Sequence, residues 1–174
     1  MRATGAAMLL CAAGWATPAA ADSDDATATA RIVAPLSFFN TQGLDFGIII
    51  PSNRQGFVTV AVTGAVTSTN GIVTIPNTQA LARFSGKGTQ NQFVAVSLGA
   101  NTIQLTGPGA NMRVDQFIIS STPTAQQLTT VPATFRIGSP TGVFDFAIGA
   151  RLRVNAGQRR GTYRGTFRVN LDYL

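Results

Sequence analysis

The sequence contains no histidine and no glutamate, and it has one lysine and one cysteine. Without histidine, the chain lacks the usual general base near neutral pH and the commonest nitrogen ligand for metals. Cys11 lies in a segment that we expect to be removed, so the mature chain would have no thiol nucleophile, disulfide or sulfur metal site. Stability must then come from packing alone, and no cofactor is expected.

The chain's side-chain carboxylates are seven aspartates. Glycoside cleavage usually needs two carboxylates across a cleft. Three of the aspartates are close together near residue 22, and Asp45 and Asp145 fall within expected strands. Asp115 and Asp172 fall on the outward positions of two other expected strands. The sequence therefore predicts no catalytic residue, no metal ligand and no enzyme.

The N-terminus has the pattern of a secretory signal peptide. Arg2 supplies a positive charge, residues 6–16 form an apolar run too short to span a bilayer, and small alanines follow. We predict a signal peptide at residues 1–21, with cleavage between Ala21 and Asp22. The mature chain would be exported to the periplasm and then to the cell surface, with no transmembrane segment.

Lysine and arginine outnumber aspartate by 13 to 7, which gives a net charge of +6. Such a charge can indicate nucleic-acid binding, but export argues against a nucleic-acid partner. Four arginines lie on the outward positions of the last two expected strands: Arg151, Arg153, Arg164 and Arg168. If these strands pair, the four side chains form a basic surface for acidic polysaccharide or lipid headgroups; otherwise they form a solvated face.

Short strand-like segments bounded by Gly, Pro or Asn fill the rest of the chain. We expect an extended segment at 26–39, a turn at 40–43, and strands at 44–50, 56–63, 72–75, 92–98, 101–105, 112–119, 132–137, 144–154 and 161–174. Residues 79–84 fit a strand or one helical turn, and Asn70–Gly71 is a hairpin signal. Without any helical period, this pattern predicts an all-β, immunoglobulin-like Greek-key β-sandwich over residues 32–174.

The last fourteen residues alternate without interruption. One face carries Tyr163, Gly165, Phe167, Val169, Leu171 and Tyr173, and the other face is polar. An apolar strand at the end of a chain must lie inside a sheet or leave an edge with which another chain can pair. We therefore expect the function of the protein to depend on how this strand finds a neighbour.

This C-terminal stretch resembles the end of chaperone–usher pilus subunits of Gram-negative bacteria. Those subunits carry a penultimate aromatic residue and a glycine fourteen residues from the end, which Tyr173 and Gly161 match. The segments Leu44–Gly47, Phe144–Gly149 and Gly161–Phe167 also resemble an exported family, domain of unknown function 4402. The resemblance implies a fimbrial subunit whose partners are related subunits, a periplasmic chaperone and an outer-membrane usher.

The sandwich would then lack its final strand, and a groove beside residues 161–174 would stay open. The N-terminal extension of another copy, residues 22–31, could fill this groove through main-chain hydrogen bonds. Such a head-to-tail contact propagates into a filament. The acceptor strand would be Gly161, Tyr163, Gly165, Phe167, Val169, Leu171 and Tyr173, and the donor side chains would be Ala26, Ala28, Ala30 and Ile32.

Alanine is an unusual donor, because each missing methylene forgoes about 0.8 kcal/mol of burial. An alternative stays open at this point. The chain could be a self-complete exported sandwich whose own first segment pairs with its last strand. Such a domain would bind acidic polysaccharide or act in adhesion at the cell envelope.

Overall fold

The computed structural model describes residues 27–120 and 125–174. The chain divides into two units, Met1–Arg31 and Ile32–Leu174. Residues 27–31 are exposed and have no regular secondary structure. The predicted signal peptide, its cleavage point at Ala21 and Asp22, and the donor residue Ala26 lie outside the described residues. No helix in the described residues is long and apolar enough to cross a membrane.

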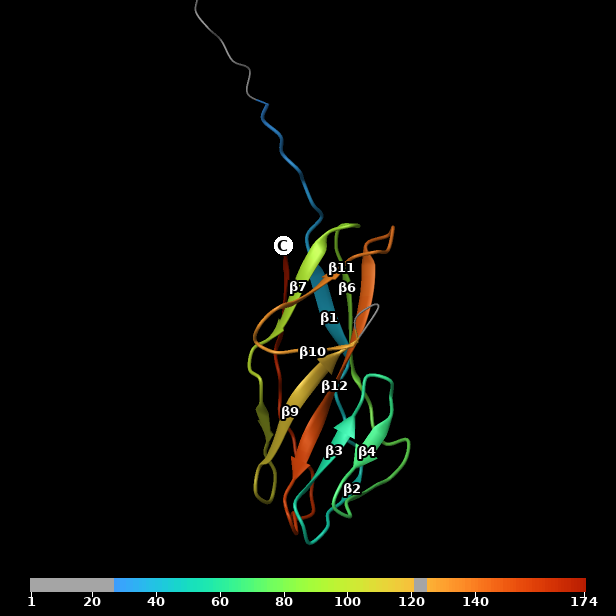
Figure 1. Cartoon of the computed structure of the whole chain (residues 1–174), viewed down its shortest axis with the longest axis vertical. Helices are drawn as coiled ribbons and strands as arrows, with labels where there is room; N and C mark the ends of the chain where they lie inside the picture. The colour runs from blue at the N-terminus through green and yellow to red at the C-terminus, as the bar shows by residue number, and fades with distance from the viewer. Residues whose placement is uncertain (1–26, 121–124) are drawn as a thin grey trace, which may run out of the picture. The chain divides into compact units, whose positions relative to one another are not determined.

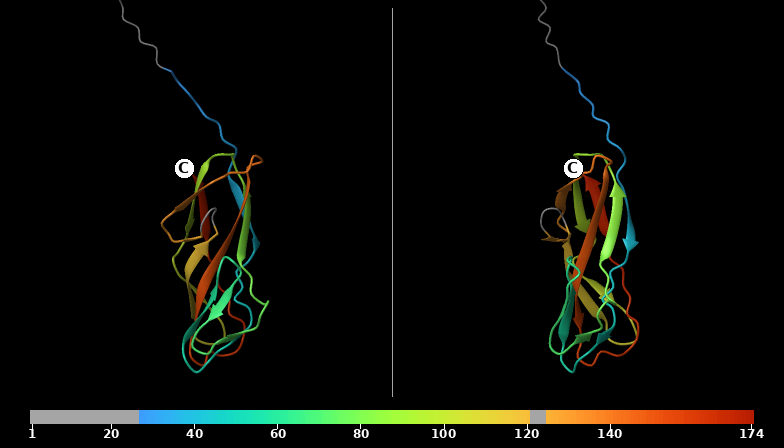
Figure 2. Two further views of the ribbon diagram at one scale, coloured as in Figure 1. Left: turned by 45° about the vertical axis from the view of Figure 1, so that its right-hand side comes forward. Right: turned by 90° about the vertical axis from the view of Figure 1, so that its right-hand side faces the viewer.

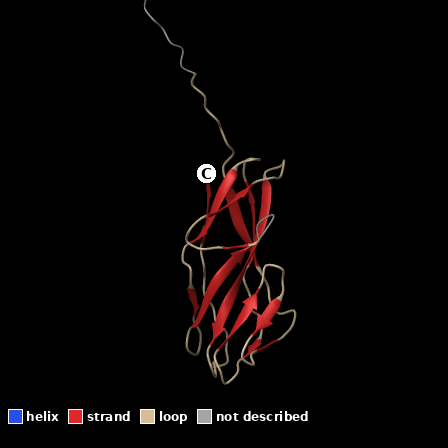
Figure 3. Ribbon diagram, viewed as in Figure 1, coloured by secondary structure: helices blue, strands red, loops and turns tan. Residues whose placement is uncertain are grey.

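Every regular element of the described residues is a β-strand, as the sequence predicts (Figures 1 and 3). The strands are β1 (Ser37–Gln42), β2 (Ile49–Ile50), β3 (Gly56–Val60), β4 (Val66–Ser68), β5 (Val73–Thr74), β6 (Ala82–Lys87), β7 (Phe93–Leu98), β8 (Ile103–Leu105), β9 (Met112–Ile119), β10 (Gln126–Gln127), β11 (Ala133–Arg136), β12 (Val143–Val154) and β13 (Val169–Tyr173). All pairings between them are antiparallel.

The long strand β12 organises the largest sheet. Its first half pairs with β6 and its second half with β3, while β9 pairs along its other edge. The order of this sheet is β1-β6-β12-β3-β4, with β8 and β10 attached to β9. At Gly149, between the halves of β12, a Cβ atom would overlap the carbonyl oxygen of Val60. Glycine at this position therefore lets β12 pass closely beside β3.

A second sheet, of order β11-β7-β13, covers part of the large one (Figure 2). Aromatic rings join the two layers. The ring centroids of Phe135 on β11 and Phe144 on β12 are 5.5 Å apart, and those of Phe117 on β9 and Phe167 are 5.2 Å apart. Because side chains from facing sheets interdigitate in this way, the fold is that of a β-sandwich.

Two expected elements differ from the structure near the N-terminus. The expected turn at 40–43 is wrong, because β1 continues to Gln42 and bulges against β6 between Asn40 and Gln42. The side-chain amide of Asn40 donates to the carbonyl oxygens of Gln42 and Arg83, at 2.7 and 3.0 Å, and so replaces ladder hydrogen bonds lost at the bulge. The expected buried strand at 44–50 shrinks to β2, and part of it is exposed.

The Asn70–Gly71 turn is confirmed, but its strands pair differently from the expected hairpin. Both residues have positive φ, 55° and 76°, as a type I′ turn requires. The strand after this turn, β5, pairs with β2 instead of returning along β4. The turn is a local property of Asn-Gly, whereas the partner of β5 is decided by the position of residues distant in sequence.

The prediction that Asp115 faces solvent is wrong. Asp115 lies on β9 and is 5% exposed. Arg113 Nη2 lies 2.6 Å from its Oδ2, and Arg151 Nε of β12 lies 2.8 Å from its Oδ1. Burial by itself raises the pKa of Asp115, but the hydrogen bonds and charges of Arg151 and Arg113 hold this pKa below its ordinary value of 3.8.

We predict that Asp115→Asn lowers the free energy of unfolding at pH 7 by about 2 kcal/mol, because both arginines lose a charged partner. A carboxylate with a lowered pKa stabilises the fold above its unfolded pKa, and this contribution disappears as the pH falls through the folded pKa. The difference between wild type and variant should therefore shrink below pH 3.8. Denaturant unfolding followed by circular dichroism at pH 7 and at acid pH measures it.

Asp145→Asn is the matched control, because Asp145 lies on β12 and is exposed. This variant should unfold like wild type at pH 7. Equal stability of Asp115→Asn and Asp145→Asn at pH 7 would show that the ion pairs of Asp115 do not stabilise the fold.

Candidate functional site

The C-terminal strand β13 lies at the edge of the three-stranded sheet. It pairs with β7 along one side, and no other described strand pairs with it. The backbone amide of Leu174 donates to the carbonyl oxygen of Phe93, and the backbone amide of Gly99 donates to the carbonyl oxygen of Arg168. Along an antiparallel strand, the backbone groups of successive residues point alternately toward the partner strand and away from it, and these two bonds show that Arg168 and Leu174 point theirs toward β7. The amide and carbonyl groups of Val169, Leu171 and Tyr173 therefore point toward the open edge.

Only the last part of the C-terminal segment, residues 161–174, lies in the sheet. Residues 161–168 were expected to continue the strand, but their pairing is limited to an isolated bridge between Arg164 and Thr106 and to the bond from Gly99 to Arg168. The alternation still holds along most of the segment. Tyr163, Phe167, Val169, Leu171 and Tyr173 are half-buried and pack against the core, whereas the residues between them are exposed.

A cavity of about 1030 Å³ adjoins this segment. One wall is formed by residues within 44–51, and the other by residues 158–167. The floor consists of Leu105, Met112, Leu152 and Val154, of which the last three are buried core residues. Four predicted acceptor residues line it: Gly161, Tyr163, Gly165 and Phe167. The structure thus brings these residues together above an opening that reaches the core.

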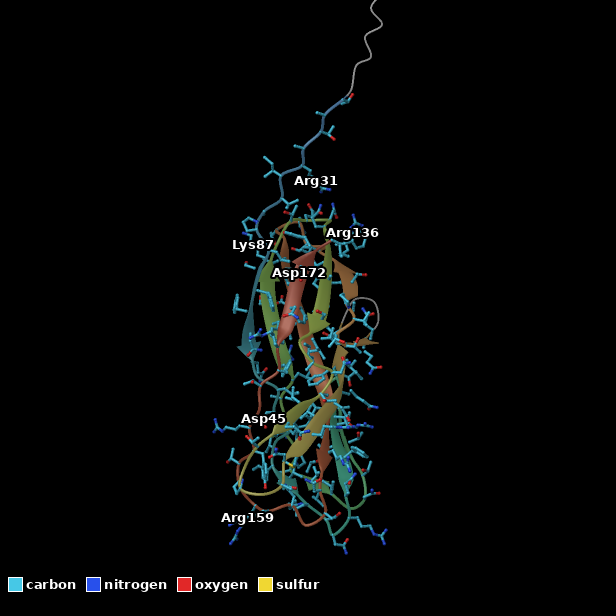
Figure 4. All side chains as sticks on the ribbon, turned by 90° about the vertical axis from the view of Figure 1, so that its left-hand side faces the viewer. Arg31, Asp45, Lys87, Arg136, Arg159 and Asp172 are labelled. Carbon is cyan, nitrogen blue, oxygen red and sulfur yellow. The ribbon has the colours of Figure 1, made fainter. Side chains whose placement is uncertain are left out.

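The cavity wall also carries cationic side chains, of which sequence reasoning had singled out Arg164 but missed Arg159 and Arg160. Arg159, Arg160 and Arg164 line the cavity together with Asp45. Figure 4 shows Asp45 and Arg159 on one side of the fold, toward the end away from Asp172. Within the described residues, Arg113 and Arg151 form ion pairs with Asp115, whereas Arg159, Arg160 and Arg164 form none. The Arg159–Arg160 pair just before Gly161 was the available sequence signal.

Tyr173 joins the end of the acceptor strand to the start of the fold. Its hydroxyl donates to the carbonyl oxygen of Ala34 at 2.8 Å and accepts from the amide of Thr89 at 2.7 Å. The amide of Ala34 donates to Thr89 Oγ1 at 2.7 Å. A Cβ atom at Gly88 would lie 2.7 Å from the tyrosine oxygen, so glycine leaves room for these bonds. Ala34 is thereby fixed beside the open end of β13.

Gly161 has a structural role of its own. Its φ is +142°, in a region that favours glycine, and an added Cβ atom would lie 2.5 Å from Pro108 Cγ. A side chain at Gly161 would therefore strain the fold itself. Substitutions there cannot distinguish a role in assembly from a role in folding.

The described donor residues are not inserted into the fold. Ala28 and Ala30 are exposed, and Ile32 is 96% exposed. The first strand, β1, starts at Ser37 and pairs with β6. The pairing expected of a self-complete sandwich, between the chain's own first segment and its last strand, is thus not the one that the described residues form.

The strand pairing on which the basic surface of four arginines depended does not occur in the described residues. Arg151 and Arg153 lie on β12 in the large sheet, whereas Arg164 and Arg168 belong to the C-terminal segment, whose sheet partner is β7. Arg151 binds Asp115 and lies 4.4 Å from the ring centroid of Phe57. Arg153 Nη2 donates to Gln55 Oε1 at 2.6 Å. The two strands do not pair, because each has its ladder partners elsewhere.

No group of three His, Cys, Asp or Glu side chains with metal-binding geometry occurs in residues 27–120 and 125–174.

We predict that Tyr173→Phe lowers the free energy of unfolding by about 1–2 kcal/mol, because the Thr89 amide and the Ala34 carbonyl lose their partner. Hydrogen exchange of the Thr89 amide should accelerate. The control is Tyr163→Phe. It removes a hydroxyl that donates to the carbonyl oxygen of Arg159 at 2.7 Å and makes no bond to Thr89. Unchanged exchange at Thr89 in Tyr173→Phe would refute this role of the hydroxyl.

Comparison with known proteins agrees with the family resemblance. One family model, described as a domain of unknown function (DUF4402), matches residues 36–173. No curated protein and no solved structure matches the chain. The matched range covers the sandwich from just before β1 to the last residue of β13. The chain therefore belongs to the DUF4402 family.

Proposed function

We propose that this protein is a structural subunit of a cell-surface fibre that assembles by donor-strand exchange. The N-terminal extension of one copy, residues 22–31 with Ile32, fills the groove beside the C-terminal segment of the next. The subunit is exported through its signal peptide to the periplasm of a Gram-negative bacterium. A chaperone covers the same edge there until an outer-membrane usher passes the subunit on.

One observation carries this proposal. The open edge of β13 continues into a cavity lined by residues 161–167 and floored by core residues, while the chain's own residues 27–33 lie outside every ladder. A sandwich of immunoglobulin type that lacks its last strand has this combination. An added strand would satisfy the open backbone groups and cover the half-buried side chains at once.

Backbone hydrogen bonds must supply much of the affinity of such a contact. The donor side chains Ala28 and Ala30 carry one methyl group each, so they contribute little burial. Each net hydrogen bond contributes about 1 kcal/mol. Phe167, Leu171 and Tyr173 already fill part of the space above the core, which leaves a shallow groove suited to small donor residues.

We predict that the double variant Ala28→Asp/Ala30→Asp folds normally but does not assemble. Both residues are exposed in the free chain, so the substitution does not disturb the sandwich, whereas two charges in an apolar groove oppose insertion. The matched control is Thr27→Asp/Thr29→Asp, with the same charge on the opposite side of the donor. Envelope fractions compared by electrophoresis, unboiled and boiled in detergent, and by electron microscopy measure assembly.

Wild type and the threonine variant should give a ladder of oligomers that collapses on boiling, and fibres under the microscope. The alanine variant should give monomer only. Equal assembly of both variants, or the absence of oligomers and fibres from wild type, would contradict donor-strand exchange and leave the self-complete sandwich.

A further inference from the structure

The small sheet of β2 and β5 exposes apolar side chains on one face. Ile50 lies opposite Val73, and the amide of Ile75 donates to the carbonyl oxygen of Ile48, which makes these two residues the next pair. Ile48, Ile50, Val73 and Ile75 are 59%, 51%, 52% and 38% exposed. All four are β-branched and share one side, because side chains alternate along both strands. We call this face the ribbon patch.

None of the four side chains of the ribbon patch belongs to the hydrophobic core or packs against it. Ile49, on the other side of β2, packs against the core and holds the small sheet in place. The neighbouring strand β4 exposes Thr67 and Ser68 instead. A contiguous set of exposed aliphatic side chains is typical of a surface that another protein covers.

The ribbon patch adjoins the cavity. Ile48, Ile49 and Pro51 line that cavity, so a segment inserted there passes directly beside the patch. In Figure 1, β2 lies at the end of the sandwich opposite the C-terminus.

The opposite end of the sandwich carries a second apolar set, around Tyr173. It consists of Ile32, Val33, Phe93 and Leu174, which are 96%, 37%, 54% and 69% exposed. The bond from Leu174 to Phe93 and that from Tyr173 to Ala34 place the four residues around the end of β13. We call this set the root patch, because the N-terminal extension leaves the sandwich here.

We propose that the ribbon patch of one copy docks on the root patch of the copy whose extension fills the adjoining cavity. This inference rests on the proposed donor-strand exchange and adds a second contact to it. The partner is thus another copy of this chain, and the contact joins two different surfaces. Heterologous contacts of this kind propagate instead of closing.

The position of Ala34 supports this arrangement, because its bonds to Tyr173 and Thr89 hold the start of the N-terminal extension at the Tyr173 end of β13. If an inserted extension left the groove at the Tyr173 end, the root patches of the two copies would meet. The two copies could then close into a dimer instead of a fibre. A chain of subunits continues only if the extension leaves at the ribbon end. Ile32 and Val33 of the donor then emerge beside Ile48, and the two apolar patches face each other.

The docking contact would also compensate for the weak donor. Alanine side chains bury little area in the groove, whereas the two patches offer eight larger apolar side chains in total. Docking makes both sets inaccessible to water at the moment when the strand is exchanged. The fibre would therefore be held together by the inserted strand and by a contact between neighbouring sandwiches.

The test uses the mature chain with Val73→Lys, which places a charge in the middle of the ribbon patch. Assembly of full-length subunits should slow by about tenfold or more, because a lysine would be buried against the root patch. The matched control is Val131→Lys, at a residue that is 72% exposed and belongs to neither patch. It should assemble like wild type. Light scattering and electron microscopy follow assembly.

A second measurement separates docking from insertion. A labelled peptide of residues 22–31, which ends before Ile32, is titrated into the Ala28→Asp/Ala30→Asp chain, which keeps its groove but cannot donate. Adding Val73→Lys should change the peptide affinity by less than about twofold, since the peptide has no root patch. The variant Val73→Lys/Phe93→Asp should regain most of the lost assembly rate through a lysine–aspartate contact between copies.

Three results would overturn the docking contact: normal assembly of Val73→Lys, an equal loss in Val131→Lys, or an equal loss of peptide binding and assembly in Val73→Lys. Failure of the peptide to bind the unmodified groove would instead refute donor-strand exchange itself, and the docking contact with it. Thermal unfolding of each variant verifies that the sandwich is intact.

Discussion

A strand that has a neighbour on only one side leaves a row of backbone donors and acceptors without protein partners, and β13 is such a strand. Its position explains the features around it. Tyr173 fixes the end of the strand to Ala34 and Thr89, so the open edge has a defined geometry. The half-buried side chains of the C-terminal segment keep the edge seated on the core. Under the donor-strand exchange that we propose, an edge held this firmly accepts one additional strand in one register.

Local patterns in the sequence predicted the fold class, most strand positions and the alternation of the C-terminal segment. Such patterns report which residues share a face, and this property belongs to each strand alone. Pairing partners depend on distant residues, which is why β5 was wrongly expected to pair within a hairpin and why the sequence left open whether the strands of Arg151 and Arg164 pair. Asp115 was misplaced for a related reason. A buried carboxylate in a strand has the same spacing as an exposed one, and the two arginines that stabilise it come from two strands.

The cavity could be predicted only in part. The residues of its C-terminal wall were found from their alternation, but the opposite wall, within residues 44–51, was expected to be a buried strand. Three isoleucines in succession favour burial in any scale of hydrophobicity. In the structure, Ile49 faces the core while Ile48 and Ile50 face away. Within residues 27–120 and 125–174, the short β2 pairs only with β5, and no layer covers its outer face. Exposure of this kind is a property of the assembled sheet order.

The alanine-rich extension and the apolar ribbon patch are best understood together. A donor with bulky side chains would bind its groove tightly, but it would also be an exposed apolar segment before assembly. Alanines lower that risk and weaken the strand contact. In the contact that we propose, apolar area lies instead on a rigid ribbon beside the cavity. Part of the binding energy would then come from side chains that lose little conformational entropy on docking, because β-branched residues are already restricted in χ1. The rigid contact also forms only when a whole subunit arrives in the correct orientation. If the interface consists of an alanine-rich strand and a rigid patch, assembly requires a folded neighbouring subunit. An extended alanine-rich peptide alone would not replace it.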